Sequence, residues 1–471
     1  MDKILKESYI YKFLIIVKNF FQKLLSGSLF VQKFLKNNYN EEYAKQSILS
    51  KLLNLFLKFI RKIARKLKFD KIFENSIFAK PLLWVSITVA MTPILPTMLD
   101  LGLVLLSFLS FVLMISIDES FEFKHYKINS WIFAFIVVVG ISACISISLA
   151  ESLKIAMLLI AFLLFYFIII NVIKTKKDVQ RLVYILIIVA TFTAIYGIYQ
   201  YMFGDVYSQA WLDEEMFEDI SMRVYSTLDN PNVYGEYLIL MIPMIIGLLW
   251  TEKGWKRKSM LFISLCLCAI ALILTFSRGC WLGIILAVAI LAVIINKKFI
   301  FLGIIMLFIM PFILPESIIN RFMSIGDMGD SSTSYRVYIW MGTLAMLKDY
   351  WLSGVGMGIT SFNTIYPIYS YNGIIAPHAH NLYLQVLVEY GIVGFGVMAG
   401  VMFNYFKEII ISLKSKKNIL LSSMMAGMFG FLLQSMTDYT WYNYRVFLMF
   451  WIIIAISVSL ANINVREKDN D

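Results

Sequence analysis

The sequence predicts an all-α integral membrane protein with about 12 transmembrane helices and one large outer loop. Of its 471 residues, 60% are hydrophobic, and the mean hydropathy is +0.75. Several stretches reach about 18–20 largely uncharged residues, which is the span of a bilayer core. These stretches do not alternate as barrel strands do, so a bundle of helices is the expected class.

The expected spans follow one another along the chain with mostly short connections. They lie near residues 81–98, 100–117, 129–149, 153–173, 181–203, 233–250, 258–276, 279–295, 298–315, 382–403, 418–436 and 441–463. The first two are short and share a tight turn at 96–101, so a re-entrant pair is an alternative to two crossings.

Positive charge gathers at the N-terminal end. Residues 1–80 hold 17 Lys and Arg against 6 Asp and Glu, which accounts for the whole net charge of +11. Two basic amphipathic runs, near 4–36 and 47–73, carry it. Such helices lie along anionic membrane surfaces, and nucleic acid is not the expected partner because the apolar faces would then stay exposed. We expect an extension at 1–80, a membrane domain at 81–463 and a cytoplasmic tail at 464–471.

Loop charges predict the orientation of the membrane domain. The loops at 174–181, 251–258, 296–298 and 407–417 are rich in Lys and Arg, whereas the alternate loops carry few cations. Because positive loops stay in the cytoplasm, both termini are expected inside and the long 316–381 loop outside.

The outer loop is expected to be ordered. A helix is predicted at 334–350, with Ser331, Ser332 and Thr333 as capping residues and Trp340, Leu344 and Leu347 along one face. A Gly-rich turn at 354–358 and an aromatic stretch follow.

Two of the three histidines, His378 and His380, end this loop at the start of a predicted span. Histidine exchanges protons near neutral pH, so the pair indicates proton chemistry at the outer membrane face. Asn381 and the helix start would fix the position of His380 more closely than that of His378. Glu389 lies about two and a half helical turns further on, where it is either a packing residue or part of the site.

Few cations face outward, and three of them are arginines. Arg278 lies between two apolar runs, and Arg336 lies in the first turn of the outer-loop helix, where the helix dipole disfavours a cation. Both are candidates for binding an anion, and arginine is the usual choice for phosphate. Arg223 is equally compatible with an ordinary salt bridge, and Asp438 is expected to cap a helix. Cys266 and Cys268 make a poor metal pair, so no metal and no cofactor are predicted.

At this point four motifs resemble those of one family. Residues 380–394 resemble the His-Asn…Glu-x-Gly-x-x-Gly signature of the O-antigen ligase and O-antigen polymerase family. Ser277-Arg278-Gly279 resembles its Ser-Arg-Gly element, Arg336 with Trp340 its outer-loop segment, and the run from Asn230 to Gly235 its Asn-Pro-Asn turn. The motifs occur in the family's order within about residues 80–460, and the N-terminal extension lies outside the resemblance.

The resemblance implies a metal-independent membrane glycosyltransferase of the lipid-donor (GT-C) type. Its donor would be an undecaprenyl-diphosphate-linked glycan and its acceptor a hydroxyl of a glycan, lipid or protein. In this chain His380 would be the base, and Arg278 and Arg336 would hold the diphosphate. Arg223, His378, Glu389 and Asn381 are possible supporting residues, and ligase and polymerase activities both stay open.

Two other functions fit the pattern less well. A transporter or flippase of lipid-linked glycans would need charged groups along a central path, but charges inside the expected spans are sparse. A peptidoglycan-type polymerase would use an acidic residue of the outer loop, for which Asp327 and Asp330 are available.

Overall fold

The computed structural model describes residues 46, 48–73, 76–204 and 222–470. The chain divides into two compact units, residues 1–51 and 52–471. Most of the first unit, including the amphipathic run expected at 4–36, lies outside the described residues. The second unit holds every candidate site residue.

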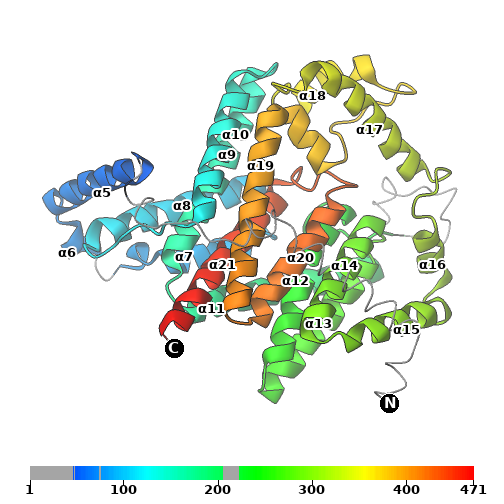
Figure 1. Ribbon diagram of the computed structural model, residues 1–471, viewed down its shortest axis with the longest axis horizontal. Coiled ribbons are helices and arrows are strands. Elements are labelled where there is room, and N and C mark those ends of the chain that lie inside the picture. The colour runs from blue at the N-terminus through cyan, green and yellow to red at the C-terminus, as the bar shows by residue number, and fades with distance from the viewer. Residues whose placement is uncertain (1–45, 47, 74–75, 205–221, 471) are drawn as a thin grey trace, which may run out of the picture. The chain divides into compact units, whose positions relative to one another are not determined.

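Each predicted span contains a helix, and the described part of the chain contains no strand (Figure 1). The first nine correspond to α7 (Pro81–Met91), α8 (Thr97–Ile117), α9 (Lys127–Cys144), α10 (Leu149–Val172), α11 (Lys176–Phe203), α12 (Pro231–Thr251), α13 (Trp255–Ile273), α14 (Arg278–Ile295) and α15 (Lys298–Ile313). The last three correspond to α19 (Leu382–Ser415), α20 (Ile419–Gln434) and α21 (Tyr444–Asn470). Helix α21 continues through most of the predicted tail.

Eight of the described helices are long and apolar enough to cross a membrane. They are α8, α9, α10, α11, α12, α14, α19 and α21, the last counted over Tyr444–Glu467. Helices α7 and α20 are apolar but shorter, and the 11 residues of α7 extend only about 16 Å, half of a bilayer core. The part of the chain that the structure describes is therefore all-helical, and the protein is a polytopic membrane protein.

The 316–381 loop is ordered, as expected. It contains α16 (Glu316–Met323), α17 (Ser331–Tyr350), α18 (Ile359–Ile365) and the 3-10 turn η3 (Tyr366–Tyr369). Helix α17 begins three residues earlier than predicted, because the Asp330 side chain, and not a serine or threonine, caps it by accepting from the Thr333 N–H. The predicted apolar face is partly wrong, since Leu344 is exposed while Ile339 is buried.

A close helix crossing holds two parts of the site together. Helix α14 packs on α20 at Gly283 and Gly430, where a Cβ on Gly283 would lie 2.7 Å from the Gly430 carbonyl oxygen. Small residues allow helix backbones in a membrane to approach in this way. At the ends of these helices, a Cβ on Gly279 would lie 2.6 Å from the Thr437 hydroxyl oxygen. The crossing therefore places Arg278 beside the turn that carries Asp438.

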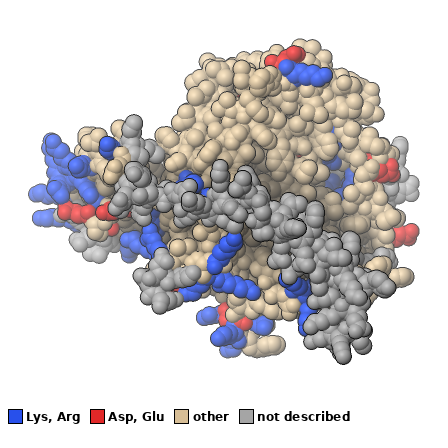
Figure 2. Space-filling view, in the orientation of Figure 1, with Lys and Arg blue, Asp and Glu red and all other residues tan. Residues whose placement is uncertain are grey.

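The second basic run forms α5 (Ile48–Lys66) and α6 (Phe69–Phe73). Figure 2 shows Lys and Arg gathered over α5, and large apolar side chains such as Leu55 and Phe59 are also exposed there. Arg61 donates to the backbone carbonyls of Ile115 and Asp118 at the end of α8, over 3.3 and 2.7 Å. Arg65 of the same helix pairs with Glu119 over 2.6 Å. The helix is thus amphipathic and held at the end of α8.

Candidate functional site

The centre of the site is a contact between His380 and Asp438. His380 precedes α19, and Asp438 lies in the turn between α20 and α21; the His380 Nδ1 lies 3.2 Å from the Asp438 Oδ1. Asn381 caps α19 by accepting from two backbone N–H groups, and it donates to the Met436 carbonyl over 2.7 Å. His380 has a φ of 44°, a left-handed conformation that costs a non-glycine residue free energy. The hydrogen bonds of Asn381 and Asp438 hold the His380 backbone in this strained conformation and thereby fix its imidazole.

Asp438 is surrounded by groups that favour its ionised form. Asn232 donates to its carboxylate over 3.0 Å, and an Arg336 nitrogen lies 3.8 Å away. Burial opposes ionisation, but the hydrogen bond from His380 and the positive charge of Arg336 lower the pKa of Asp438 well below its usual range. A carboxylate at Nδ1 makes this nitrogen the donor and leaves Nε2 of His380 as the proton acceptor.

His378 lies on the other side of His380, with ring centroids 4.1 Å apart. Its Nδ1 accepts from the backbone N–H of His380 over 3.2 Å, and its ring packs against Tyr442. Burial, with the neighbouring His380, lowers the pKa of His378 to about 3. His378 is therefore neutral near pH 7 and supports the backbone of His380.

Four arginines line one cavity of about 370 Å³, which we call the arginine cavity: Arg223, Arg278, Arg321 and Arg336. Polar side chains such as Ser332 and Gln434 also line it, together with apolar ones, among them Phe276, Leu282, Ile325, Met328, Val337 and Trp340. The Nε of Arg336 is buried without a hydrogen-bond partner. A buried donor of this kind needs an acceptor, which a ligand in the cavity would supply.

Two of these arginines share a buried carboxylate. Arg278 donates twice to Asp330, over 2.6 and 2.9 Å, and Arg321 lies 3.3 Å from the same carboxylate. Burial opposes ionisation, but the hydrogen bonds and charge of Arg278, with Arg321, hold the pKa of Asp330 below its usual value. Asp330 is thus a fixed structural anion, and it cannot serve as the free acid or base of a peptidoglycan-type polymerase.

Arg223 joins the two groups of charges. Its guanidinium donates to the Asn232 side chain over 2.8 Å, and Asn232 in turn donates to Asp438. Burial, and the nearby charges of Arg321, Arg336 and Arg278, lower the pKa of Arg223 to about 9. The four guanidiniums thus repel one another, and among the described residues the carboxylates of Asp330 and Asp438 lie against them. The arrangement favours a bound anion.

A second cavity of about 580 Å³, which we call the aromatic cavity, lies on the His378 side. Aromatic side chains and carboxylates line it, including Tyr439, Trp441, Tyr442, Glu151 and Glu389. Glu389 accepts from Gln385 and Tyr439, over 2.9 and 3.1 Å. The kink of α19 at Gly391, where φ is 67°, follows directly.

The structure brings most of the predicted site residues together. Arg223, Arg278 and Arg336 line the arginine cavity. His380 contacts Asp438, and Asp438 in turn lies next to Arg336 of that cavity. His378 and Glu389 line the aromatic cavity instead. Whether these residues act on a substrate stays a prediction.

Three residues of the site were not predicted: Asp438, Asn232 and Arg321. The expectation that Asp438 caps a helix is wrong, because the Asn443 side chain accepts from the first N–H groups of α21. The available signal for Asn232 was its place in the Asn-Pro-Asn turn, where Asn230 caps α12. The available signal for Arg321 was its position as an arginine within the outer loop, where the structure has a short helix.

His378, His380 and Asp438 also form a group that could hold a metal ion, since one ligand atom from each lies within 4.8 Å of the others. However, Nδ1 of His378 already accepts a backbone hydrogen bond, and Nδ1 of His380 bonds to Asp438. The Arg336 guanidinium beside Asp438 adds a positive charge that opposes a cation. These contacts fit a hydrogen-bonded pair better than a metal centre.

Comparison with known families agrees with the motifs. Residues 262–399 match the family model described as O-antigen ligase. The match includes Arg278, Arg336 and His380, while Arg223 and Asp438 lie outside it. No curated protein matches the chain. The apolar helices define a polytopic membrane protein, and the match to the family model suggests a glycosyltransferase-like class. The match over residues 262–399 confirms the resemblance to the O-antigen ligase family that the motifs predicted.

Proposed function

We propose that the protein transfers a glycan from an undecaprenyl-diphosphate donor to an acceptor hydroxyl on the outer face of the membrane. The observation that carries this proposal is the His380–Asp438 pair, 3.2 Å apart, next to a cavity lined by four arginines. A proton acceptor beside an anion site is what glycosyl transfer from a diphosphate requires.

The arginine cavity would hold the diphosphate. Arginines bind phosphate oxygens through paired N–H donors, and the buried Nε of Arg336 is a donor in need of an acceptor. The apolar lining residues, such as Leu282 and Val337, suit the first isoprene units of the lipid. The cavity thus offers both the charge and the apolar surface of such a donor.

His380 would act as the base. Its Nε2 takes the proton of the acceptor hydroxyl while the hydroxyl oxygen attacks the anomeric carbon of the donor sugar. The bond between this carbon and the diphosphate oxygen breaks, and the diphosphate leaves with the electron pair. Asp438 stabilises the imidazolium that forms, and the arginines offset the charge of the leaving group without a metal ion.

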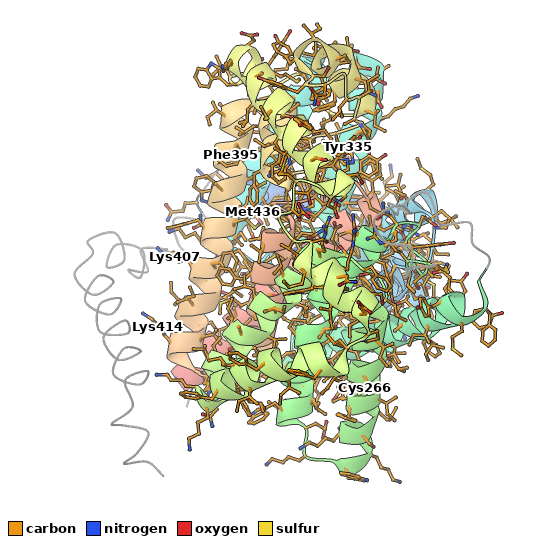
Figure 3. The ribbon with its side chains drawn as sticks, turned by 90° about the vertical axis from the view of Figure 1, so that its right-hand side faces the viewer. Cys266, Tyr335, Phe395, Lys407, Lys414 and Met436 are labelled. Atoms are coloured by element: carbon orange, nitrogen blue, oxygen red, sulfur yellow. The ribbon has the colours of Figure 1, made fainter. Side chains whose placement is uncertain are left out.

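The direction of α19 supports an outward-facing site. This helix starts beside His380 and ends in the cation-rich segment that contains Lys414. Figure 3 shows Tyr335 and Met436, near the site, above Lys407 and Lys414. Since positive loops stay in the cytoplasm, the site would face outward and both termini inward. We also propose a lipid-donor (GT-C) type of fold with about twelve membrane helices, of which α7 enters the membrane without crossing it alone. Residues 1–80 would have a membrane-surface role.

A deletion strain complemented with variants tests this function. With the His380→Ala variant, we expect lipid-linked glycan to accumulate where a membrane-impermeant probe can reach it, and surface polymer to be lost. The His125→Ala variant is the matched control, because His125 lies between α8 and α9, away from both cavities, and we expect normal glycan from it.

The form of the defect separates the alternatives. Short surface chains indicate a polymerase, and unattached long chains indicate a ligase. Glycan that accumulates where the probe cannot reach it would contradict a transferase and indicate a flippase. Normal surface glycan with His380→Ala would also contradict the proposal.

A further inference from the structure

The aromatic cavity has no part in donor binding as proposed above, yet it is larger than the arginine cavity, at about 580 against 370 Å³. It is bounded by the start of α8, the start of α10, the turn before α21 and the first turns of α19. Pockets of this size bind small molecules or parts of larger ones. The two cavities differ sharply in their chemistry.

The first difference is the number of aromatic side chains. Tyr439, Trp441 and Tyr442 lie in the turn before α21, Tyr444 begins that helix, and all four line the aromatic cavity. Trp441 is only 4% exposed, and its indole N–H has no hydrogen-bond partner. A buried donor among flat apolar rings fits a ligand with both C–H faces and acceptor oxygens.

The second difference is the charge. Three carboxylate residues, Glu151, Asp229 and Glu389, line the aromatic cavity against one arginine, Arg445. The arginine is paired with Asp229, to which it donates over 2.5 Å, and it also donates to the Thr227 carbonyl over 2.7 Å. Glu151 and Glu389 therefore supply the negative charge of this lining. Carboxylates accept hydrogen bonds from hydroxyl groups but repel phosphates and other carboxylates.

The third observation is the place of the cavity relative to the base. His378 lines the aromatic cavity, and its ring lies against that of His380, which bonds to Asp438. Asp438 lies next to Arg336, which lines the arginine cavity. The two cavities therefore lie on either side of the histidine pair, so that a hydroxyl held in one can approach a donor held in the other.

We propose that the aromatic cavity binds the acceptor as a saccharide, and that its carboxylates select a terminal sugar without negative charge. This inference rests on the proposed function. The sugar ring would stack on Tyr442, and its hydroxyls would donate to Glu151 and Glu389. An acceptor with phosphate or carboxylate on its terminal sugar would meet like charge and would be bound poorly.

Glu151 and Tyr442 are the positions at which specificity can be tested. Glu151 accepts from the Thr360 backbone N–H over 3.1 Å, and a glutamine keeps this acceptor while removing the charge. Tyr442 is 43% exposed and packs on His378, so a leucine removes the ring with little effect on the core. Tyr371, also 43% exposed but outside both cavities, provides the matched control for Tyr442.

The experiment measures transfer in proteoliposomes with an undecaprenyl-diphosphate-linked glycan as donor. Two acceptors are compared: a neutral oligosaccharide, and the same oligosaccharide oxidised at its terminal sugar to carry one carboxylate. In Tyr442→Leu, we expect the KM for the neutral acceptor to rise about tenfold and the KM for the donor to change less than about twofold. In Glu151→Gln, the preference for the neutral over the oxidised acceptor should fall about tenfold.

The outcomes separate this inference from the proposed function. If the wild type transfers glycan and His380→Ala does not, the function holds. In that case, an acceptor KM that is unchanged in Tyr442→Leu, or that rises equally in Tyr371→Leu, overturns the acceptor site. Equal use of both acceptors by the wild type overturns the charge selection. Full transfer by His380→Ala overturns the function itself.

Discussion

The side-chain amide of Asn232 donates to the Asp438 carboxylate over 3.0 Å. Asn232 lies in the first turn of α12, and Asp438 lies 206 residues later in the turn before α21. The same amide accepts from Arg223 over 2.8 Å. One asparagine thus connects the carboxylate that orients His380 to the arginine cavity.

We therefore expect Asn232 to be a positioning residue. Asn232→Ala removes a hydrogen bond to a charged group, so kcat for transfer should fall about tenfold. Asn232→Asp should be worse, because two neighbouring carboxylates repel each other. The conservative Asn232→Gln, which keeps both hydrogen-bonding groups, should recover part of the activity.

The control for this prediction is Asn129→Ala. Asn129 also forms side-chain hydrogen bonds, with Tyr166 and Lys124, but it lines neither cavity. Equal kcat values for the two alanine variants, at equal thermal stability, would show that the Asn232 contact has no catalytic consequence.

The arginines should divide into two kinds. Asp330 is fully buried, so Arg278→Ala leaves it with only part of its countercharge, and we expect the free energy of unfolding to fall by about 3–5 kcal/mol.

Arg336→Ala should raise the KM for the donor about tenfold with a smaller effect on stability, because its carboxylate partner is 3.8 Å away. Thermal unfolding and donor titration measure the two effects.

A double variant checks the explanation for Arg278. In Arg278→Met with Asp330→Asn, the buried charge is removed together with its partner, so part of the lost stability should return. If the double variant is less stable than the sum of the two single variants predicts, the Arg278–Asp330 pair does not act as described.

Stability should decrease on acidification because of His378. Its pKa is about 3 in the folded protein and about 6.5 in an unfolded chain, so protons bind the unfolded state preferentially between these values. The free energy of unfolding should fall by about 1.4 kcal/mol for each pH unit below 6.5 on this account. The lowered pKa of Asp438 adds stability that is present above about pH 4 and is lost only at lower pH.

Thermal unfolding of the purified protein between about pH 4.5 and 7.5 measures this dependence. The His378→Phe variant keeps an aromatic ring against Tyr442 and should flatten the slope, whereas His125→Phe should keep it. The same slope in wild type and His378→Phe would mean that another group is responsible.

The helices were predictable because each apolar stretch is long, and every expected span contains one. The crossing count was less predictable, since α7 is too short to cross alone, although its sequence is as apolar as its neighbours. Helix α17 was placed within three residues, but its cap was missed because Asp330 and the adjacent serines are all good capping residues.

The candidate site was predictable only where a residue was rare or out of place. His380 was notable as one of three histidines, and Arg278 and Arg336 as outward-facing cations. Asp438 offered no such signal, because an aspartate in a polar turn is ordinary. Its contact with His380, 58 residues away, depends on hydrogen bonds that join the start of α19 to the turn after α20, such as the one from Asn381 to the Met436 carbonyl, and no local pattern reveals them.

Chelation tests whether the arginines act without a metal ion. We expect glycan transfer after treatment with EDTA to stay within about twofold of the untreated rate, since guanidiniums offset the diphosphate charge. Loss of activity that added Zn²⁺, Mn²⁺ or Mg²⁺ restores would instead assign His378, His380 and Asp438 as metal ligands.

The most direct test of the account is the rate of glycan transfer by His380→Ala in proteoliposomes that contain the lipid-diphosphate donor. We expect a fall of about 10²–10⁴-fold in kcat, with the KM for the donor nearly unchanged because the arginine cavity is intact. Under the same conditions His125→Ala should match the wild type. A His380→Ala protein that transfers glycan at the wild-type rate would contradict the account.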